Sequence, residues 1–343
     1  MTKVLIRLAI ALFIFGAVGG GSLFWARMAA QTPGPSPVPT NLVVAKGSGS
    51  QVISEQLAEA GVIRRPWLFL LTLRLSGHPS LQAGEYAFPA MISLNGIIEM
   101  MHKGQVVVHK ITVAEGLTVH QVLAELRQAE GLAGGVPQIP DEGSLLPQTY
   151  FYSLGDSRDS VLGRMERGMN EALDDLWPKR KKLPQIPNKM DALILASIVE
   201  RETALPAERP HIAAVFLNRL KLHMRLQSDP TVIYAASKGE GVLDHPLTRD
   251  ELALKSPFNT YASDGLPPGP ICNPGRASLQ AVLNPADSDD LYFVADGSGG
   301  HVFAKSLDEH NKNVAKWRQV EAQKDVKAEA KAESKPKPKA ASH

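Results

Sequence analysis

Two carboxylates close the most apolar helical segment of the chain, the run MDALILASIVERET over residues 190–203. Before Glu200, only Asp191 and Ser197 interrupt its apolar residues. A carboxylic acid at the end of such a helix is partly desolvated, which raises its pKa and suits it to general acid catalysis near neutral pH. At about 100° per residue, Glu200 and Glu202 lie about 200° apart, so they cannot both face one site. One of them is therefore structural or exposed.

The helical pattern does not decide which of Glu200 and Glu202 is the chemical group, because both follow apolar residues on their own face of the helix. A purely structural interpretation stays open for either carboxylate. It would make the carboxylate a salt-bridge partner of Arg201, Arg209 or Arg219.

A second set of polar residues lies in short loops farther along the chain. Tyrosine and amide side chains beside rigid prolines suit a sugar ring, because they offer an apolar face for stacking and polar groups for hydroxyl and acetamido substituents. The loop GLPPGPI (265–271) is such a stiff segment. The simpler interpretations are a helix cap for the aspartate and a tight connection between helices for the loop. The candidate binding residues are Gln227, Asp229, Asn259, Thr260 and Tyr261, with Ser228 between the first two.

Other catalytic chemistries lack a sequence pattern. The ten histidines show no HExxH or comparable metal spacing, so we expect no metal site and no cofactor. Ser197 has no GxSxG elbow. Cys272 is the single cysteine, lies in a proline-rich loop and has no adjacent histidine, which disfavours a nucleophilic role and rules out an internal disulfide.

Clear start and stop signals surround these residues and predict a mainly helical region over about 145–317. We expect helices over about 189–203, 208–220 and 228–236, with Ser228 as a cap before Pro230. Thr248 with Glu251, and Ser306 with Glu309, have the spacing of capping boxes. Asn273 before Pro274 predicts a further capped helix to Leu283, and residues 291–295 and 301–304 around DGSGG predict a β-hairpin.

The region over about 41–113 has a different pattern, which predicts both helices and strands. We expect a strand at 42–45, helices at 52–60, 66–75 and 94–102, an extended QAGEYAF stretch, and a strand at 106–113. A similar pattern restarts at AEGLTVHQVLAELRQAEGL, where apolar residues share one helical face.

The N-terminus predicts a membrane anchor. Residues 8–26 contain no charge and as a helix span about 28 Å, enough for one bilayer crossing. A cleaved signal peptide is the alternative, but its apolar core is shorter and ends in a small-x-small site. Lys3 and Arg7 precede the span, which by the positive-inside rule places the body of the chain across the membrane. Four prolines in residues 31–40 indicate a stiff spacer.

Composition limits the remaining function classes. Lysine and arginine number 37 and aspartate and glutamate 35, a net charge of +2. Six lysines and three acids in residues 322–343 supply +3 of it, so the rest of the chain sums to −1. A broadly basic nucleic-acid surface is therefore not expected. The tail over 321–343 has too few apolar residues for a core and predicts a frayed helix end or disorder.

Five segments in register resemble the YceG-like endolytic murein transglycosylases, the MltG family. They are ASIVERETALPAERPHIAAVFLNRLKLHMRLQSDPTVIY from Ala196, LTRDEL, SPFNTY, GLPPGPICNPG and LYFVADGSGGHVF. The resemblance is close over about 145–317 and looser upstream. Departures are Arg201 where lysine is common, Phe258 where tyrosine is common, and Cys272 where a small residue is usual.

The resemblance implies an enzyme that cuts peptidoglycan glycan strands between N-acetylmuramic acid and N-acetylglucosamine and leaves 1,6-anhydro ends. It implies that the catalytic glutamate is the one before Thr203, which is Glu202, and that the loop residues around Gln227, Asp229 and Asn259–Tyr261 line the binding site. It also implies a LysM-like glycan-binding module and proximity to the peptidoglycan synthesis machinery.

The predicted fold class is thus α+β, in five parts. These are a transmembrane anchor at 1–30, a Pro-rich linker at 31–40, one or more LysM-like α+β modules at 41–144, a catalytic domain at 145–320 and a tail at 321–343. We expect an inner-membrane protein with a single span and its catalytic domain in the periplasm. The alternatives are a hydrolytic muramidase, which would leave reducing ends, and a non-catalytic wall-binding anchor.

Overall fold

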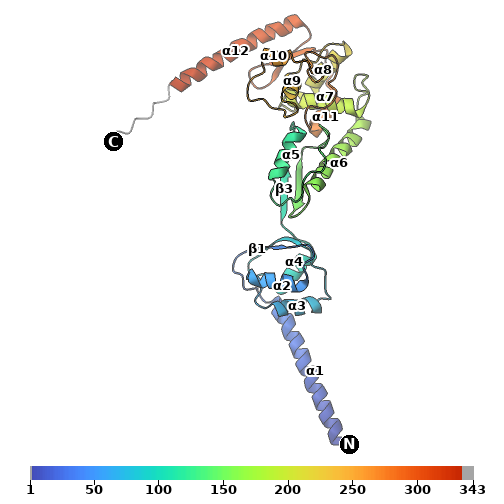
Figure 1. Ribbon diagram of the computed structural model, residues 1–343, viewed down its shortest axis with the longest axis vertical. Helices are drawn as coiled ribbons and strands as arrows, with labels where there is room; N and C mark the ends of the chain where they lie inside the picture. Colours follow the sequence, from blue (N-terminus) through green and yellow to red (C-terminus); the bar gives the residue numbers. More distant parts are fainter. Residues whose placement is uncertain (1, 334–343) are drawn as a thin grey trace, which may run out of the picture. The chain divides into compact units, whose positions relative to one another are not determined.

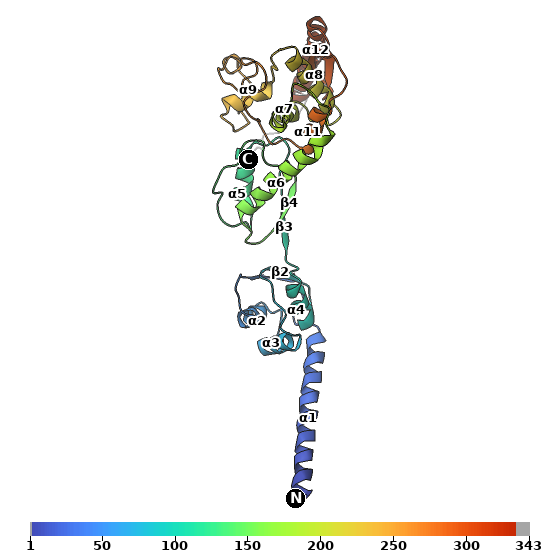
Figure 2. The ribbon, with the colours of Figure 1, turned by 90° about the vertical axis from the view of Figure 1, so that its right-hand side faces the viewer.

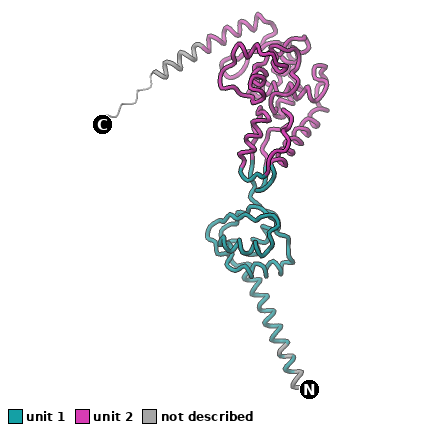
Figure 3. The backbone as a smooth tube through the Cα atoms, viewed as in Figure 1, with its two compact units in different colours: residues 1–110, 130–133, 151–157 teal, residues 111–129, 134–150, 158–343 magenta. Residues whose placement is uncertain are grey.

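The computed structural model describes residues 2–333 and divides the chain into two compact units (Figure 3). Unit 1 comprises residues 1–110, 130–133 and 151–157, and unit 2 the remainder. The division near residue 110 means that the expected boundary at 144/145 lies inside unit 2. Helices and strands both occur, which confirms the α+β class.

Helix α1 (Thr2–Gln31) opens unit 1. Its segment Ile6–Gln31 is long and apolar enough to cross a membrane, as the uncharged run predicts. Towards its C-terminal end α1 packs against α3 and α4 of the same unit. Ala26 and Ala30 are buried there, because small side chains let the helices approach closely.

The rest of unit 1 is a small α+β module, whose elements are labelled in Figures 1 and 2. Strands β1 and β2 pair antiparallel, with Thr40 opposite Phe88 and Val44 opposite Gly84. Apolar side chains from both strands and the three helices form one core, in which Leu57 and Phe69 are fully buried. The elements are β1 (Thr40–Val44), α2 (Ser50–Glu59), α3 (Pro66–Leu75), β2 (Gly84–Phe88) and α4 (Leu94–His102).

Strands β3 (Val108–Thr112) and β4 (Thr149–Ser153) form a second two-stranded sheet whose residues belong to both units. Unit 2 then continues through helices, a hairpin and a last helix. Its further elements are α5 (Val119–Gln128), α6 (Arg158–Leu176), η1 (Trp177–Lys179), α7 (Lys189–Glu202), α8 (Arg209–Lys221), α9 (Asp229–Ala236), α10 (Arg249–Leu252), α11 (Arg276–Leu283), β5 (Tyr292–Ala295), β6 (His301–Ala304) and α12 (Leu307–Glu333).

Helix α7 lies at the centre of unit 2 and packs against α8, α9 and α11 (Figures 1 and 2). The Asn188 side chain caps its start by accepting a hydrogen bond from the Asp191 amide. Every residue from Ala192 to Glu200 is buried, as the nearly unbroken apolar run predicts. The helix ends at Glu202 because Thr203 is extended. The core of unit 2 therefore fixes the position of both terminal carboxylates.

Several predicted signals are confirmed. Thr248 and Glu251 form both bonds of a capping box at α10. Strands β5 and β6 pair as a hairpin, with Tyr292 opposite Ala304. Helix α12 continues to Glu333, so the first part of the expected tail is helical, and residues 334–343 lie outside the described part of the chain.

Of two further predicted caps, one is confirmed in position only and the other is wrong. Ser228 is the N-cap residue of α9, as expected, but its side chain makes no capping bond. Helix α11 begins at Arg276 after Gly275, whereas the Asn273 side chain accepts from the Leu145 amide and donates to the Leu117 carbonyl. Both side chains instead form hydrogen bonds with residues that are distant in the sequence.

Candidate active site

Glu200 is the ion-paired carboxylate of the two. Its side chain is 3% exposed, and its Oε1 lies 2.8 Å from Arg209 Nη2. Its Oε2 accepts a hydrogen bond of 2.8 Å from the Gly275 amide at the start of α11. Burial raises the pKa of Glu200, while these bonds act in the opposite direction. The salt-bridge interpretation therefore applies to Glu200, which joins α7, α8 and α11.

Glu202 is placed differently. It is only partly exposed, and its Oε1 accepts a hydrogen bond of 2.5 Å from the Ser228 hydroxyl. No ion pair involves Glu202 among residues 2–333. The pKa of Glu202 is raised to about 7: desolvation is the main cause and the Asp229 charge adds to it, while the hydrogen bond from Ser228 and the charges of His301 and Arg219 act in the opposite direction. A carboxyl group with this pKa is present in both protonation states near neutral pH, so it can give a proton and take one back.

A buried network of hydroxyl groups holds Ser228 in place. The Ser228 amide donates to Thr260 Oγ1 at 3.0 Å, and its carbonyl accepts from Thr231 Oγ1 at 2.6 Å. The two threonine hydroxyls lie 2.8 Å apart. This network joins the start of α9 to the loop at 259–261. The position of the Ser228 hydroxyl that donates to Glu202 therefore depends on both segments.

Asp229 and Tyr261 form a second polar pair beside Glu202. The Tyr261 hydroxyl donates to Asp229 Oδ1 at 2.6 Å. Desolvation and the Asp229 charge raise the pKa of Tyr261, which keeps its hydroxyl protonated. Asp229 is exposed and Tyr261 partly exposed, so both can contact a ligand.

Arg219 supplies a buried positive charge to the same region. It is 8% exposed, and its guanidinium donates to the carbonyl groups of Leu226 and Leu291 at 2.9 and 2.6 Å. It also reaches the exposed Gln227, whose Oε1 lies 3.5 Å away. Arg219 thus fixes the segment that leads into Ser228.

The hairpin contributes His301 to this site. Glu208 Oε2 lies 2.7 Å from His301 Nδ1 and accepts at 3.1 Å from Thr203, the residue after Glu202. Partial burial would raise the pKa of Glu208, but the bonds from His301 and Thr203 outweigh it and lower the pKa. These contacts tie the start of β6 to the end of α7. No local sequence pattern points to His301 or Glu208, because the two residues are 93 positions apart in the chain.

The predicted binding residues separate into two groups. Gln227, Asp229 and Tyr261 lie at least partly on the surface. Asn259 and Thr260 are buried, at 0% and 1% exposed, and their side chains bond to protein atoms. The side chains of Asn259 and Thr260 therefore hold the loop that carries Tyr261, and direct contact of these two residues with a substrate stays a prediction.

The proline loop is anchored on α7 rather than forming an open wall. The Ile271 amide donates to the Ser197 hydroxyl at 3.0 Å, and Cys272 Sγ lies 3.2 Å from the Ser197 carbonyl. Pro267 and Pro270 are buried, while Pro268 is exposed. Burial also raises the pKa of the Cys272 thiol, so it stays protonated.

Comparison with known proteins covers the part of the chain that contains all of these site residues. The family model of the YceG-like family matches residues 42–316. This chain belongs to the YceG-like family. The family expected from the five sequence motifs is thereby confirmed, and the match spans Glu202, Ser228 and His301 alike.

Curated and solved relatives of this YceG-like protein agree with the family match. An endolytic murein transglycosylase of Bacillus subtilis is 32% identical over 332 residues, covering 88% of this chain and 91% of the relative. One from Streptococcus pneumoniae is 27% identical, and the match covers 79% of this chain and 57% of that longer protein. The crystal structure of a YceG-like protein of Listeria monocytogenes has a TM-score of 0.51 and 29% identity, covering 80% of this chain and 98% of that one.

Proposed function

We propose that this YceG-like protein is a membrane-anchored endolytic murein transglycosylase, which cuts peptidoglycan glycan strands between N-acetylmuramic acid and N-acetylglucosamine. Family membership and the names of its curated relatives support the activity. The single observation that carries the mechanism is Glu202, a carboxyl group with a pKa of about 7 and a short hydrogen bond to Ser228.

The reaction then needs one acid that also serves as base. Protonated Glu202 gives its proton to the glycosidic oxygen, and the bond from muramic acid C1 to that oxygen breaks. The substrate acetamido group assists the oxocarbenium-like centre, and the muramic acid 6-hydroxyl attacks C1. The Glu202 carboxylate takes the 6-hydroxyl proton, which forms the 1,6-anhydro ring and restores the acid.

Neighbouring groups have distinct roles in this proposal. Ser228 orients the Glu202 carboxylate. The Asp229 charge favours the protonated acid at the start of the reaction and stabilises positive charge that develops on the sugar. Tyr261 and Gln227 offer polar groups to the glycan, while Asn259 and Thr260 position the loop from within.

A hydrolytic muramidase is the second candidate, and Asp229 is the observation that favours it. Hydrolytic glycosidases use two carboxylates, one as acid and the other to activate water or attack the sugar. Asp229 is close enough to Glu202 to raise its pKa. Against this role, Asp229 Oδ1 already accepts a hydrogen bond from Tyr261.

Digestion of sacculi by the purified full-length protein in heavy-oxygen water distinguishes the candidates. We expect glycan ends that are lighter than reducing ends by one water molecule and carry no heavy oxygen. Reducing ends with one heavy oxygen would identify a muramidase. Retention of sacculi without any cleavage would identify a wall-binding anchor.

The membrane placement is also part of the proposal. Lys3 and Arg7 before the apolar run favour a cytoplasmic N-terminus, which puts both units in the periplasm of an inner-membrane protein. There, unit 1 acts as a LysM-like glycan-binding module, and the catalytic unit meets strands near the peptidoglycan synthesis machinery. The order β1-α2-α3-β2 around one small core supports an independent binding module. Protease access to unit 2 only from the periplasmic side of intact spheroplasts would agree with this orientation.

A further inference from the structure

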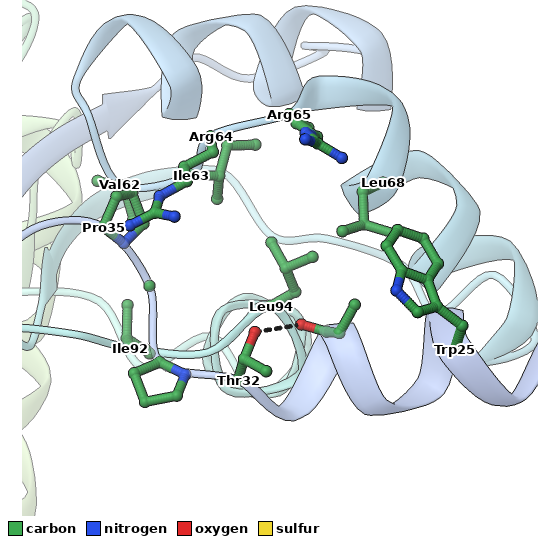
Figure 4. Close-up of a pocket in the computed structure, with 13 residues that line it drawn as sticks. Trp25, Thr32, Pro35, Val62, Ile63, Arg64, Arg65, Leu68, Ile92 and Leu94 are labelled. Carbon is green, nitrogen blue, oxygen red and sulfur yellow. Dashed lines mark hydrogen bonds between the residues drawn. The ribbon is translucent and has the colours of Figure 1, made fainter.

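Unit 1 contains a pocket of about 270 Å³ where α1 ends (Figure 4). The end of α1, the proline-rich segment after it, and the starts of α3 and α4 line it. In Figure 4, Arg64 and Arg65 lie along one side of the opening and face Ile92 and Leu94, with Trp25 at one end. The pocket therefore combines two cationic side chains with apolar walls.

A second hollow, of about 510 Å³, lies along α1 next to this pocket. Ala17, Val18 and Gly21 line one side of it and Trp67 and Leu71 of α3 the other. Trp25 borders both spaces, so they adjoin at this residue. The small residues of α1 leave this space open.

The two spaces lie at different depths of a membrane that α1 crosses. A hydrocarbon layer of about 30 Å corresponds to about 20 helical residues, which counted from Leu8 end near Arg27. The hollow at 17–26 then lies at the depth of lipid tails, and the pocket that includes Thr32 lies at the depth of the headgroups.

Two tryptophans mark the boundary between these two depths. Trp25 and Trp67 stack with ring centroids 6.3 Å apart, and each is 51% exposed. Half-exposed tryptophans are typical of the membrane–water interface, where an apolar ring and a polar N–H are both accommodated.

The charges of the pocket match a phosphate group. Arg64 and Arg65 are exposed, and neither has an ion-pair partner within the described residues. No acidic residue is among those that line the pocket. Guanidinium groups bind phosphate oxygens with two parallel hydrogen bonds.

We propose that unit 1 binds a phospholipid of the outer leaflet, with its phosphate at Arg64 and Arg65 and an acyl chain in the hollow beside Gly21. The lipid would hold the module on the membrane surface. This inference rests on the proposed membrane crossing by α1, and not on the chemistry at Glu202.

Native mass spectrometry of the full-length protein with dioleoylphosphatidylglycerol tests the site. We expect one retained lipid that inorganic phosphate does not displace, because the acyl chain contributes to binding. Arg64→Ala/Arg65→Ala should lower retention about tenfold, as the loss of charge-assisted hydrogen bonds implies. Arg74→Ala, which removes an exposed arginine of α3 outside the pocket, should leave retention unchanged.

Equal retention by wild type and the double variant would overturn the proposal, as would displacement of the lipid by inorganic phosphate alone. Alkaline extraction of membranes shows separately whether α1 spans the bilayer, so failure of the anchor is distinguished from failure of the pocket. Cleavage of sacculi by the double variant in detergent should equal that of wild type, which separates lipid binding from catalysis.

Discussion

The Ser228 hydroxyl donates a hydrogen bond of 2.5 Å to Glu202 Oε1, from the residue that precedes one helix to the last residue of another. This bond favours the charged carboxylate and so lowers the pKa of Glu202 against the larger effect of burial. Ser228→Ala should therefore raise that pKa. We expect the alkaline limb of the pH profile of kcat/KM, which reports loss of the acid, to move above its wild-type position near pH 7. A limb that stays in place or moves down would contradict this assignment.

Removal of the Asp229 charge should shift the pKa of Glu202 in the opposite direction. Its negative charge raises the pKa of Glu202, so Asp229→Asn should lower that pKa and move the alkaline limb towards acid. Asp264→Asn provides the control, because Asp264 is exposed and pairs with Arg225. The same pH profile should leave the control variant at the wild-type position. Coincident limbs for both aspartate variants would show that Asp229 does not act on the acid.

The raised pKa of Glu202 also predicts a stability change with pH. The unfolded carboxyl has a pKa of about 4.5 and the folded one of about 7, so the folded state binds more protons between these values. The contribution of Glu202 to the free energy of unfolding is therefore most favourable below pH 4.5 and falls as the pH rises through 7. Glu202→Gln removes that loss and should be more stable than wild type at pH 8, by at most about 3 kcal/mol. Denaturant unfolding at pH 5 and pH 8 measures the difference, which should be larger at pH 8.

Substitution of Glu200 should lower the free energy of unfolding, whereas substitution of Glu202 should raise it at pH 8. Glu200→Gln leaves the buried Arg209 without its closest partner, although Glu115 Oε2 remains 3.1 Å away and the amide oxygen of the introduced side chain can still accept from the Gly275 amide. We expect a loss of about 3 kcal/mol in unfolding free energy, the range for a broken buried ion pair. Activity per folded molecule should persist. A stable but inactive Glu200→Gln protein would reverse the two assignments.

Local signals in the sequence predicted much of the fold. Helix α4 has the bounds expected from its pattern, and Thr248 with Glu251 caps α10 as their spacing indicates. These features depend on residues within one helical turn, so neighbouring sequence is enough to determine them. The antiparallel hairpin around DGSGG is predictable for the same reason.

The site itself was only partly predictable, because residues with the pattern of helix caps can instead form hydrogen bonds with residues far along the chain. Ser228 bonds Glu202, which is 26 residues away, and Asn273 bonds Leu145, which is 128 away. Helical spacing shows that Glu200 and Glu202 face different directions, but only the tertiary positions of Arg209 and Ser228 show which carboxylate is paired. Motif matching cannot separate a residue that contacts a ligand from one that holds a loop, as Asn259 illustrates.

The role of Glu202 as the catalytic acid is tested by comparing Glu202→Gln with Glu200→Gln in one assay of 1,6-anhydro ends released from sacculi. We expect Glu202→Gln to release none while it unfolds at no lower denaturant concentration than wild type at pH 8, and Glu200→Gln to form anhydro ends despite its lower stability. Wild-type levels of anhydro ends from a folded Glu202→Gln protein would contradict the assignment of Glu202.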